Sequence, residues 1–346
     1  MTEKPSNEKT IAQAELLFNR LLKRRKHLKK WARRTGTNAF RVYDRDIPEI
    51  PLVLDLYADG LAGALYKRPY EKDEAEEALW LDTMKGAASR ALEIPEDHIF
   101  LKTRQRQRGK EQYNRISKNK FERDIEEGGL LFRVNLSDYL DTGLFLDSRK
   151  RRALIGLEAK DRKVLDLFSY TCSASVYAAS GGAREIDSVD MSKTYLDWGK
   201  VNFSLNGFSA HFADTREGPE QYRRDMPRSA APPYRLIRAD VLEFMEQAVR
   251  TRKHWDLVIL DPPGFSNSKK MKTTLDLNRD HVSLISLCLK LLSKGGKLIF
   301  STNIHHFSLD REKLPRVSIR ELEKELVDED FSGKKVPRCY EIKKTD

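Results

Sequence analysis

From residue 150 onward, short apolar runs alternate with stretches of helical periodicity, and this alternation limits the possible folds more than any other feature of the chain. The expected strands are Lys163–Phe168, Glu185–Asp190, Arg235–Ala239, Leu257–Leu260 and Lys297–Ser301, and the expected helices are 174–180, 193–206, 240–250 and 279–293. Strands that alternate with helices build a mostly parallel sheet with helices on both faces. The sequence therefore predicts a doubly wound α/β domain.

The borders of this pattern carry three further expectations. Segments Glu321–Val327 and Cys339–Lys343 are candidates for final strands, and Gly295-Gly296 is expected to stop the last helix. Residues 213–233 are polar and proline-rich, which predicts an inserted surface loop.

The first 135 residues have a different pattern and predict a separate module. Residues 1–10 are expected to be a disordered leader, residues 11–135 a small α+β module, and residues 136–346 the α/β domain. The expected elements of the module are a helix at 11–35, strands at Phe40–Tyr43, Leu52–Tyr57 and Ala62–Lys67, a helix at 71–93, and a hairpin of Ile99–Lys102 with Leu130–Leu136 whose long tip is charged.

Positive charge is concentrated in this module, in a chain of net charge +11 at pH 7. Like charges at high density repel, so they are tolerated when water or phosphate groups surround them. The second of two clusters is interleaved with glutamines and a tyrosine, which contact sugars and bases, and this favours RNA over a solvated basic surface. The clusters are Arg20, Lys23, Arg24, Arg25, Lys26, Lys29, Lys30, Arg33 and Arg34, and Lys102, Arg104, Arg106, Arg108, Lys110, Arg115, Lys118, Lys120 and Arg123.

Composition argues against several other classes of protein. Charged residues make up 34% of the chain, and no apolar run approaches the roughly 20 residues that span a bilayer. The first ten residues lack the apolar core of a signal peptide. Cys172, Cys288 and Cys339 have no metal-ligand spacing, so a reduced cytoplasmic protein without a metal site or membrane partner is expected.

The segment Val258–Ser266 indicates a site. A buried strand ends in Asp261, and Pro262 and Pro263 follow at once, with Phe265 just beyond. Proline has a fixed φ and no amide hydrogen, so the chain must leave the strand as a stiff, extended turn. A carboxylate and an aromatic ring are thereby held at the carboxyl end of a strand, where open α/β sheets bind ligands.

Other acids occupy corresponding places at the ends of the expected strands. The series is Asp166 in the first strand, Asp190 at the end of the second, Asp240 after the third and Asp261 after the fourth. A turn of small hydroxylated residues, Ser169–Ala174, follows the first strand and offers backbone N–H groups to an anion. This series favours a nucleoside-type cofactor, but the first turn lacks the Gly-x-Gly-x-x-Gly of NAD sites, and a Walker sequence is absent.

These residues closely resemble the RlmK family, the carboxyl-terminal half of the bacterial fused enzyme RlmKL, which methylates guanine N7 in 23S (large-subunit) ribosomal RNA. The likeness covers about residues 15–346. The matching stretches include Lys29–Arg34, Arg41–Asp44, Leu101–Lys110, Val134–Asp147, Leu167–Thr171, Val189–Ser192 and Asp261–Lys269.

The resemblance implies a Rossmann-like fold, S-adenosylmethionine (AdoMet) as cofactor and a site built from named residues. By likeness, Asp190 with Met191 would hold the ribose, Asp240 with Val241 the adenine edge, and Asp261, Pro262, Pro263 and Phe265 would face the target base. The remaining residues expected near the cofactor are Asp147, Arg149, Asp166, Phe168, Ser169 and Thr171.

Three departures from the family pattern bear on this expectation. Cys172 stands where the family usually has glycine, which predicts a narrower approach to AdoMet. Residues 213–233 look like an insertion, and the half that modifies guanine N2 is absent. Methylation of guanine N2 or cytosine C5, and a non-catalytic role in ribosome assembly, remain alternatives to guanine N7 methylation.

Overall fold

A computed structural model describes residues 4–66, 73–104, 120–214, 233–266 and 274–345. Two compact units divide the chain, Met1–Leu146 and Asp147–Asp346. This division falls eleven residues after the expected boundary at 135/136. No helix of the described residues has the length and apolarity needed to cross a membrane.

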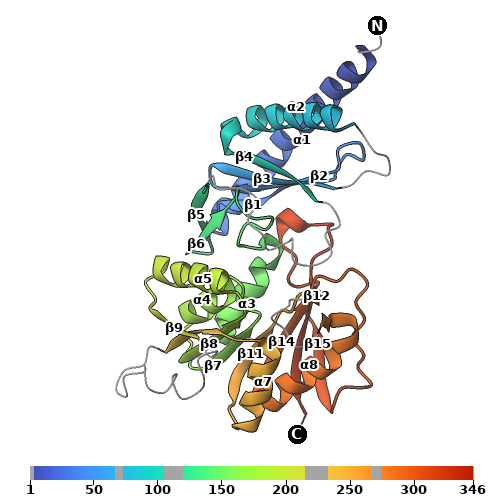
Figure 1. The fold of residues 1–346 in the computed structure, drawn as a ribbon. Helices are drawn as coiled ribbons and strands as arrows, with labels where there is room; N and C mark the ends of the chain where they lie inside the picture. The colour runs from blue at the N-terminus through green and yellow to red at the C-terminus, as the bar shows by residue number, and fades with distance from the viewer. Residues whose placement is uncertain (1–3, 67–72, 105–119, 215–232, 267–273, 346) are drawn as a thin grey trace. The chain divides into compact units, whose positions relative to one another are not determined.

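The first unit is a four-stranded sheet covered by two long helices (Figure 1). Strand order is β1-β2-β3-β4, with β3 and β4 parallel and the other pairs antiparallel. The apolar stripe of α1 and one face of α2 pack on the sheet around Leu17, Leu21 and Trp80. The elements are α1 (Lys4–Arg34), β1 (Ala39–Asp44), β2 (Leu52–Tyr57), β3 (Gly60–Tyr66), α2 (Glu74–Leu92), η1 (Glu96–His98), β4 (Ile99–Arg104), β5 (Glu122–Glu127) and β6 (Leu130–Asn135).

Two expectations for this unit are wrong. Helix α1 begins at Lys4, so most of the expected disordered leader at 1–10 is helical; Pro5 is tolerated because the first turn of a helix needs no N–H partner. The expected hairpin of β4 with β6 does not form, because β4 pairs with β3 and β6 pairs with β5. Gly128 and Gly129, both at positive φ, close the β5–β6 hairpin tightly. Residues 105–119, the centre of the expected charged tip, lie outside the described residues.

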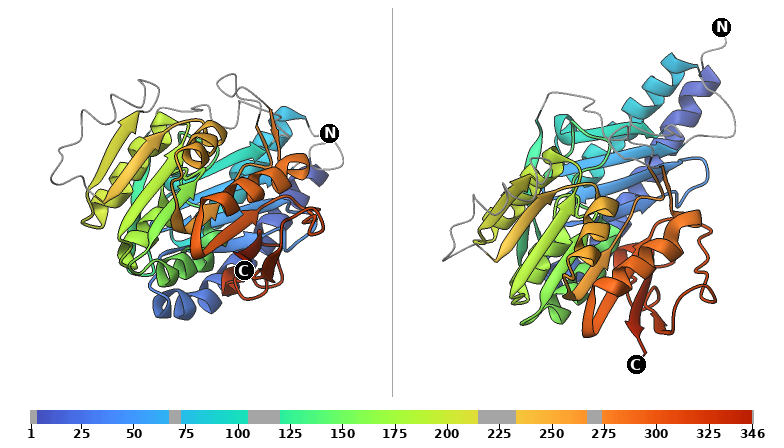
Figure 2. Two further views of the ribbon diagram at one scale, coloured as in Figure 1. Left: turned by 90° about the horizontal axis from the view of Figure 1, so that it is seen from below. Right: turned by 60° about the horizontal axis from the view of Figure 1, so that its bottom comes forward.

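The second unit is an eight-stranded sheet between two layers of helices (Figures 1 and 2). Strand order is β15-β16-β14-β11-β7-β8-β10-β9, and the run from β14 to β9 is parallel. Helices α3, α4 and α5 lie on one face and α7 and α8 on the other. The elements are η3 (Leu146–Ser148), α3 (Arg149–Glu158), β7 (Lys163–Leu167), α4 (Ser173–Ser180), β8 (Glu185–Asp190), α5 (Lys193–Leu205), β9 (Ala210–Asp214), β10 (Tyr234–Arg238), α7 (Val241–Arg250), β11 (Trp255–Leu260), β12 (Phe265–Ser266), β13 (Leu275–Asp276), α8 (Leu277–Leu291), β14 (Leu292–Thr302), β15 (Val317–Glu321), η5 (Glu329–Phe331) and β16 (Arg338–Lys344).

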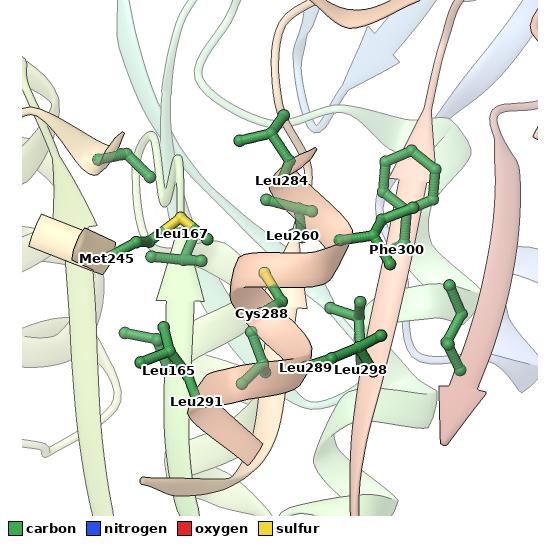
Figure 3. Packing of buried hydrophobic residues seen from close by; sticks show 14 of the residues in the cluster. Leu165, Leu167, Met245, Leu260, Leu284, Cys288, Leu289, Leu291, Leu298 and Phe300 are labelled. Atoms are coloured by element: carbon green, nitrogen blue, oxygen red, sulfur yellow. The ribbon is translucent and has the colours of Figure 1, made fainter. Parts of the chain in front are cut away.

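Alternate residues of the central strands divide between the two helical layers, as the pleat of a strand requires. Figure 3 shows the layer under α7 and α8, where Leu165 and Leu167 of β7 lie with Leu260 and Phe300. Cys288 of α8 lies in this cluster and is fully buried, as expected for a small core residue. Asp166 lies between the two leucines of β7 and therefore faces the opposite layer.

Three details at the borders of this unit differ from the expectations. Gly295-Gly296 lies inside β14 instead of ending a helix, since α8 stops at Leu291. The strand expected at Glu321–Val327 is instead β15 at Val317–Glu321. Strand β9 was not expected; it lies mostly before the segment predicted as an inserted loop and shares only residues 213 and 214 with it. Residues 215–232 lie outside the described residues.

Candidate active site

Register places three of the predicted residues level with one another at one edge of the second sheet. Leu260 of β11 pairs with Leu167 of β7, and Leu167 pairs with Val189 of β8. The chain proceeds from β7 to β8 on one side and later to β11 on the other, so this is the switch point where open sheets bind ligands. The residues that follow the paired row, and lie level at the edge, are Phe168, Asp190 and Asp261.

Asp190 is held in place by the backbone around it. Its Oδ1 accepts from the Ser192 amide at 2.8 Å and its Oδ2 from the Tyr170 amide at 3.0 Å. Burial raises its pKa to about 6 despite these N–H donors. The carbonyl of Met191, the next residue, accepts from Arg238. The carboxylate is half-buried, so it is fixed in position and still accessible.

Asp166 lies below the edge, two residues before Phe168, and is buried. The Ser175 hydroxyl, from α4, donates to its Oδ2 at 2.6 Å. The pKa of Asp166 is raised to about 7, mainly by burial, with smaller contributions from the nearby carboxylates of Asp261 and Asp190 and against the opposing effect of the Ser175 hydrogen bond. Asp166 therefore supports the turn above it and is not part of the accessible edge.

The turn between β7 and α4 has an unusual backbone. Phe168, Tyr170 and Cys172 all have positive φ, at 59°, 50° and 59°, and they alternate with the buried residues Ser169 and Thr171. Left-handed residues that alternate with residues of negative φ turn successive N–H groups toward one side, which favours an anion there. Three of these N–H groups are used within the protein, because Ser169 donates to Val189, Tyr170 to the Asp190 carboxylate and Cys172 to Ser169. The turn therefore follows β7 as expected, and these amides hold the turn itself and Asp190 in place.

The side chain of Cys172 points into the protein. Cys172 is fully buried, its sulfur lies 3.7 Å from Ser169 Oγ, and a β-carbon placed on Gly199 of α5 would lie 2.5 Å from that sulfur. Gly199 therefore provides the space that Cys172 occupies. Cys172 was expected to narrow the approach to AdoMet. In the structure its thiol instead fills space on the side of the turn that packs against α5.

This packing predicts coupling between two positions 27 residues apart. Gly199→Ala should lower the free energy of unfolding by about 1–3 kcal/mol, because the new methyl overlaps the sulfur. In a Cys172→Gly background the same substitution should cost much less, since the sulfur is gone and glycine accepts positive φ. Denaturant unfolding of the four proteins measures this difference. Equal costs in both backgrounds would contradict the packing.

Asp240 has a structural partner as well as an edge position. It lies two residues beyond the end of β10, and its Oδ1 accepts from the amides of Leu242 and Glu243, which caps α7. Val241 is buried beneath it. Its half-buried carboxylate is the outermost member of the predicted series on the β10 side.

Asp261 accepts hydrogen bonds from two buried side chains. Arg151 of α3 donates to Oδ2 at 2.6 Å, and Ser301 of β14 donates to Oδ1 at 2.6 Å. Arg151 also donates to Ser301 and to Ser148. Burial favours the neutral acid, but the charge and hydrogen bond of Arg151, with smaller effects of Ser301 and Arg152, hold the pKa of Asp261 below its ordinary value.

The residues after Asp261 leave the sheet toward solvent. Pro262 is buried, Pro263 is half-buried and Phe265 is 53% exposed. Phe265 lies in the short strand β12, which pairs with β13 ahead of α8. Four residues after Asp261, the chain therefore carries an exposed phenylalanine ring that is not packed in the core.

Asp147 and Arg149 lie where α3 begins, and Arg149 forms buried ion pairs within the protein. Arg149 Nη1 lies 2.9 Å from Asp328 Oδ2 and 3.1 Å from Asp330 Oδ1, and all three residues are buried. Asp147 is half-buried and accepts from the Ser148 hydroxyl at 3.3 Å. The structure therefore gives Arg149 an anchoring role that the sequence did not indicate.

Comparison with known proteins identifies the family. The sequence profile of the S-adenosylmethionine-dependent methyltransferases matches residues 44–244. The ribosomal RNA large subunit methyltransferase K of Neisseria meningitidis serogroup B is 42% identical over 325 residues, which cover 94% of this chain and 86% of that protein. The chain belongs to the S-adenosylmethionine-dependent methyltransferase family.

Longer relatives and solved structures extend the comparison. The ribosomal RNA large subunit methyltransferase K/L of a Marinomonas species is 40% identical over 331 residues, but this methyltransferase spans only 43% of its length. The structure of SMU.776 complexed with SAH has a TM-score of 0.70 at 21% identity and covers 95% of this chain and 81% of that one. A SAM-dependent methyltransferase from Agrobacterium tumefaciens has a TM-score of 0.58 at 19% identity, covering 90% and 91%. These likenesses confirm the expected methyltransferase fold.

The edge of the sheet suits the cofactor of the methyltransferase family. AdoMet carries ribose hydroxyls, which need acceptors, and a methionine carboxylate, which needs N–H donors. Asp190 and Asp240 are accessible carboxylates at the carboxyl ends of neighbouring strands, and the turn at Phe168–Cys172 lies beside Asp190, to which its Tyr170 amide donates. Among the described residues, no cluster of His, Cys, Asp or Glu is placed to hold a metal ion.

Two residues of this methyltransferase site were missed by sequence reasoning. Arg151 lies in the basic run Arg149–Arg152, which resembles a solvated stretch, and Ser301 ends an apolar strand. The sequence did hold a signal, because a helix that packs on a sheet must bury one face and this helix begins with four basic residues. In the structure three of the four, all arginines, are buried. Buried arginine requires an anion, but sequence spacing did not identify which one.

Proposed function

We propose that this methyltransferase transfers a methyl group from AdoMet to N7 of a guanine in 23S ribosomal RNA, in the cytoplasm. The observation that carries the proposal is Asp261, an ionised carboxylate with an exposed face, level with Asp190 at the switch point of the sheet. The curated relatives named for methylation of large-subunit RNA support the substrate class.

In the proposed complex, each edge residue takes one part of the cofactor or base. Asp190 with Met191 accepts from the ribose hydroxyls, and Asp240 with Val241 borders the adenine. The turn residues Phe168, Ser169 and Thr171 receive the methionine end, while Asp166 supports them from below and Asp147 and Arg149 flank the site. Asp261, Pro262, Pro263 and Phe265 face the base, with the exposed ring of Phe265 stacked on it.

The chemistry fits a site whose carboxylate is ionised. Bound AdoMet supplies a methyl group on a sulfonium, a good leaving group. The guanine N7 lone pair attacks the methyl carbon, the carbon–sulfur bond breaks and its electron pair stays on sulfur, so the base becomes cationic. No proton leaves N7, and the protein needs mainly to align the atoms and stabilise the new charge. Asp261 is placed to do the latter.

The cytosine C5 alternative needs a thiolate, and the cysteines do not offer one. Cys172, Cys288 and Cys339 are all buried. Cys339 pairs with Ser301 in the β14–β16 ladder and is closest to Asp261 in the fold, but burial raises its pKa to about 12. Guanine N2 must lose a proton on methylation, and a carboxylate whose pKa is held low is a weak base for it.

The decisive experiment is transfer of a tritiated methyl group to large-subunit RNA from a strain that lacks this modification. Borohydride–aniline treatment cuts RNA at 7-methylguanosine, so a cut at the labelled nucleotide is the expected result. Label without such a cut would move the assignment to guanine N2 or another atom. Absence of both label and AdoMet binding by calorimetry would favour the non-catalytic assembly factor.

The first unit offers a surface for RNA along α1. Six exposed basic residues lie within one arc of the helix, opposite the buried Leu21 and Leu28. Their span of eleven helical positions is about 16 Å, enough to follow successive phosphates. No acid interrupts the helix between Arg20 and Arg34. These six residues, the α1 stripe, are Lys23, Lys26, Lys29, Lys30, Arg33 and Arg34.

Replacing four residues of the α1 stripe by glutamine should weaken RNA binding about tenfold or more at 0.1 M salt. The slope of log affinity against log salt should fall by about 3, because each lost phosphate contact contributes about 0.7–0.9. The matched control removes four exposed cations at or just after the C-terminal ends of α7 and α8 in the second unit. It should leave both the affinity and the salt slope unchanged. The test set is Lys23, Lys26, Lys30 and Arg33, and the control set is Arg250, Lys253, Lys290 and Lys294.

A further inference from the structure

Arg151 and Ser301 act on Asp261 from the buried side only. Arg151 is 9% exposed and Ser301 0%, whereas the Asp261 side chain remains 36% exposed. Ser301 donates to one oxygen of Asp261 and accepts from Arg151, while Arg151 donates to the other oxygen. The carboxylate is therefore held at both oxygens and open on one face.

The group of Arg151, Ser301 and Asp261 differs from the buried ion pairs of Lys297 in the same unit. Lys297, also on β14, pairs with Glu158 and Glu341, and none of the three lies at the edge. A buried ion pair adds little net stability compared with apolar packing, so stability alone is a weak reason to bury Arg151. The cavity of about 10 Å³ between Arg151, Ser301 and Cys339 is too small for a ligand, which leaves Asp261 as the group these residues serve.

The charged groups around Asp261 determine whether its carboxyl group is ionised. Burial favours the neutral form of the Asp261 carboxyl group, and the two arginines of α3, Arg151 and Arg152, favour the anion. The titratable or charged groups that interact with Asp261 are Arg151 and Arg152 from α3, Asp166 from β7 and Cys339 from β16, and Asp147 ahead of α3 interacts with Arg151.

We propose that Arg151, acting with Ser301, is a positioning residue that keeps Asp261 anionic and aims its open face at the base that accepts the methyl group. The inference rests on the proposed function, because there the anion stabilises the charge that develops on the base. Arg151 itself touches neither base nor cofactor in this arrangement. Its effect passes entirely through Asp261, and this distinguishes it from a group that binds RNA.

The sign of the expected pH effect follows from the groups that remain. In the native protein Asp261 is ionised well below neutral pH, so its ionisation does not limit the rate between pH 5.5 and 8.5. In Arg151→Met, burial raises the pKa of Asp261 above its ordinary value, because the charge and hydrogen bond of Arg151 no longer oppose it. The rate of the variant relative to the native protein should then fall as pH falls, by about tenfold for each pH unit below the new pKa.

The test measures single-turnover methyl transfer at saturating AdoMet and RNA, which isolates the chemical step. Arg151→Lys should keep the ratio to the native rate nearly independent of pH, because a cation is still present. Lys297→Met is the matched control, as it also removes a buried cation from an ion pair; it should lower the melting temperature without a pH-dependent ratio. A flat ratio for Arg151→Met, with a rate loss equal to that of Lys297→Met, would overturn the proposal.

A second readout needs neither RNA nor cofactor. Carbon-13 NMR of the carboxyl groups, with the Asp261 signal assigned by Asp261→Asn, should show titration below the ordinary aspartate range in the native protein and above it in Arg151→Met. An unchanged titration would contradict the proposed effect of Arg151 on the pKa of Asp261, whatever the substrate is. Failure of the native protein to methylate 23S RNA would instead reject the proposed function and leave this NMR result standing.

Discussion

Asp261→Ala should lower the rate of methyl transfer to large-subunit RNA by about 10²–10³-fold, the usual loss when one electrostatic group at a reacting centre is removed. The loss should appear in kcat, because Asp261 acts on the charge that develops as the methyl moves. Affinity for AdoMet should change little, since Asp190 and the turn after β7 make the main proposed cofactor contacts. Tritiated methyl transfer and calorimetric AdoMet titration measure the two quantities separately.

Two control variants separate the charge of Asp261 from its packing. Asp261→Asn keeps the shape and an acceptor for Arg151 but removes the negative charge, so most of the rate loss should persist. Asp187 of β8 is also a buried aspartate paired with an arginine, at 2.5 Å from Arg235 Nε, but it lies three residues before the edge. Asp187→Ala should reduce stability and leave the rate per folded molecule intact. Full activity of Asp261→Ala would remove Asp261 from the mechanism.

Arg149→Met should cause the largest loss of stability among simple substitutions near the site. Asp328 and Asp330 are 8% and 1% exposed, and without Arg149 they would lie buried and close together with like charge. Removal of one partner from a buried ion pair typically costs about 3–5 kcal/mol. For a unit of this size the melting temperature should fall by roughly 6–20 °C. Calorimetric melting of the full chain measures the change.

The same variant decides between two roles for Arg149. Asp328→Asn and Asp330→Asn, introduced together into Arg149→Met, should restore part of the lost stability, because they remove the unbalanced charge. If Arg149 only anchors η5 to α3, the AdoMet affinity of the folded variant should match that of the native protein. A drop of tenfold or more at a temperature where the variant is folded would give Arg149 the cofactor contact that the family resemblance implies.

Much of the catalytic unit follows from local sequence. The bounds of β7, β8, β10 and β11 lie within two residues of those expected, because apolar runs and capping residues such as Asp240 and Asp276 act over a few positions. Asp190 and Asp261 could be placed at the edge for the same reason: each ends a strand, and parallel strands share one carboxyl edge.

The first unit shows where local reasoning failed. Strand β4 could pair with β3 or with β6, and its own sequence does not discriminate between these partners. The pairing depended on Gly128-Gly129, which closes β5 onto β6, and on the crossover through α2, which returns the chain parallel to β3. Strand β9 was not recognised from its own sequence either. It is the outermost strand of its sheet and has a neighbour on one side only, so it needs few apolar residues.

The ordered carboxylates at the ends of the strands, the stiff Asp-Pro-Pro turn and the basic face of α1 were all readable in the chain, because each depends on neighbours in sequence. The direction in which each acid's pKa shifts was not readable. Asp166, Asp190 and Asp261 are the same residue type at similar positions, yet burial raises the pKa of the first two while Arg151 lowers that of the third. Arg151 and Ser301 lie 110 and 40 residues from Asp261 in sequence. Only the packing of α3 and the register of β14 against β11 bring their charge and hydrogen bonds to one carboxylate, and electrostatic interactions of this strength act over a few ångströms.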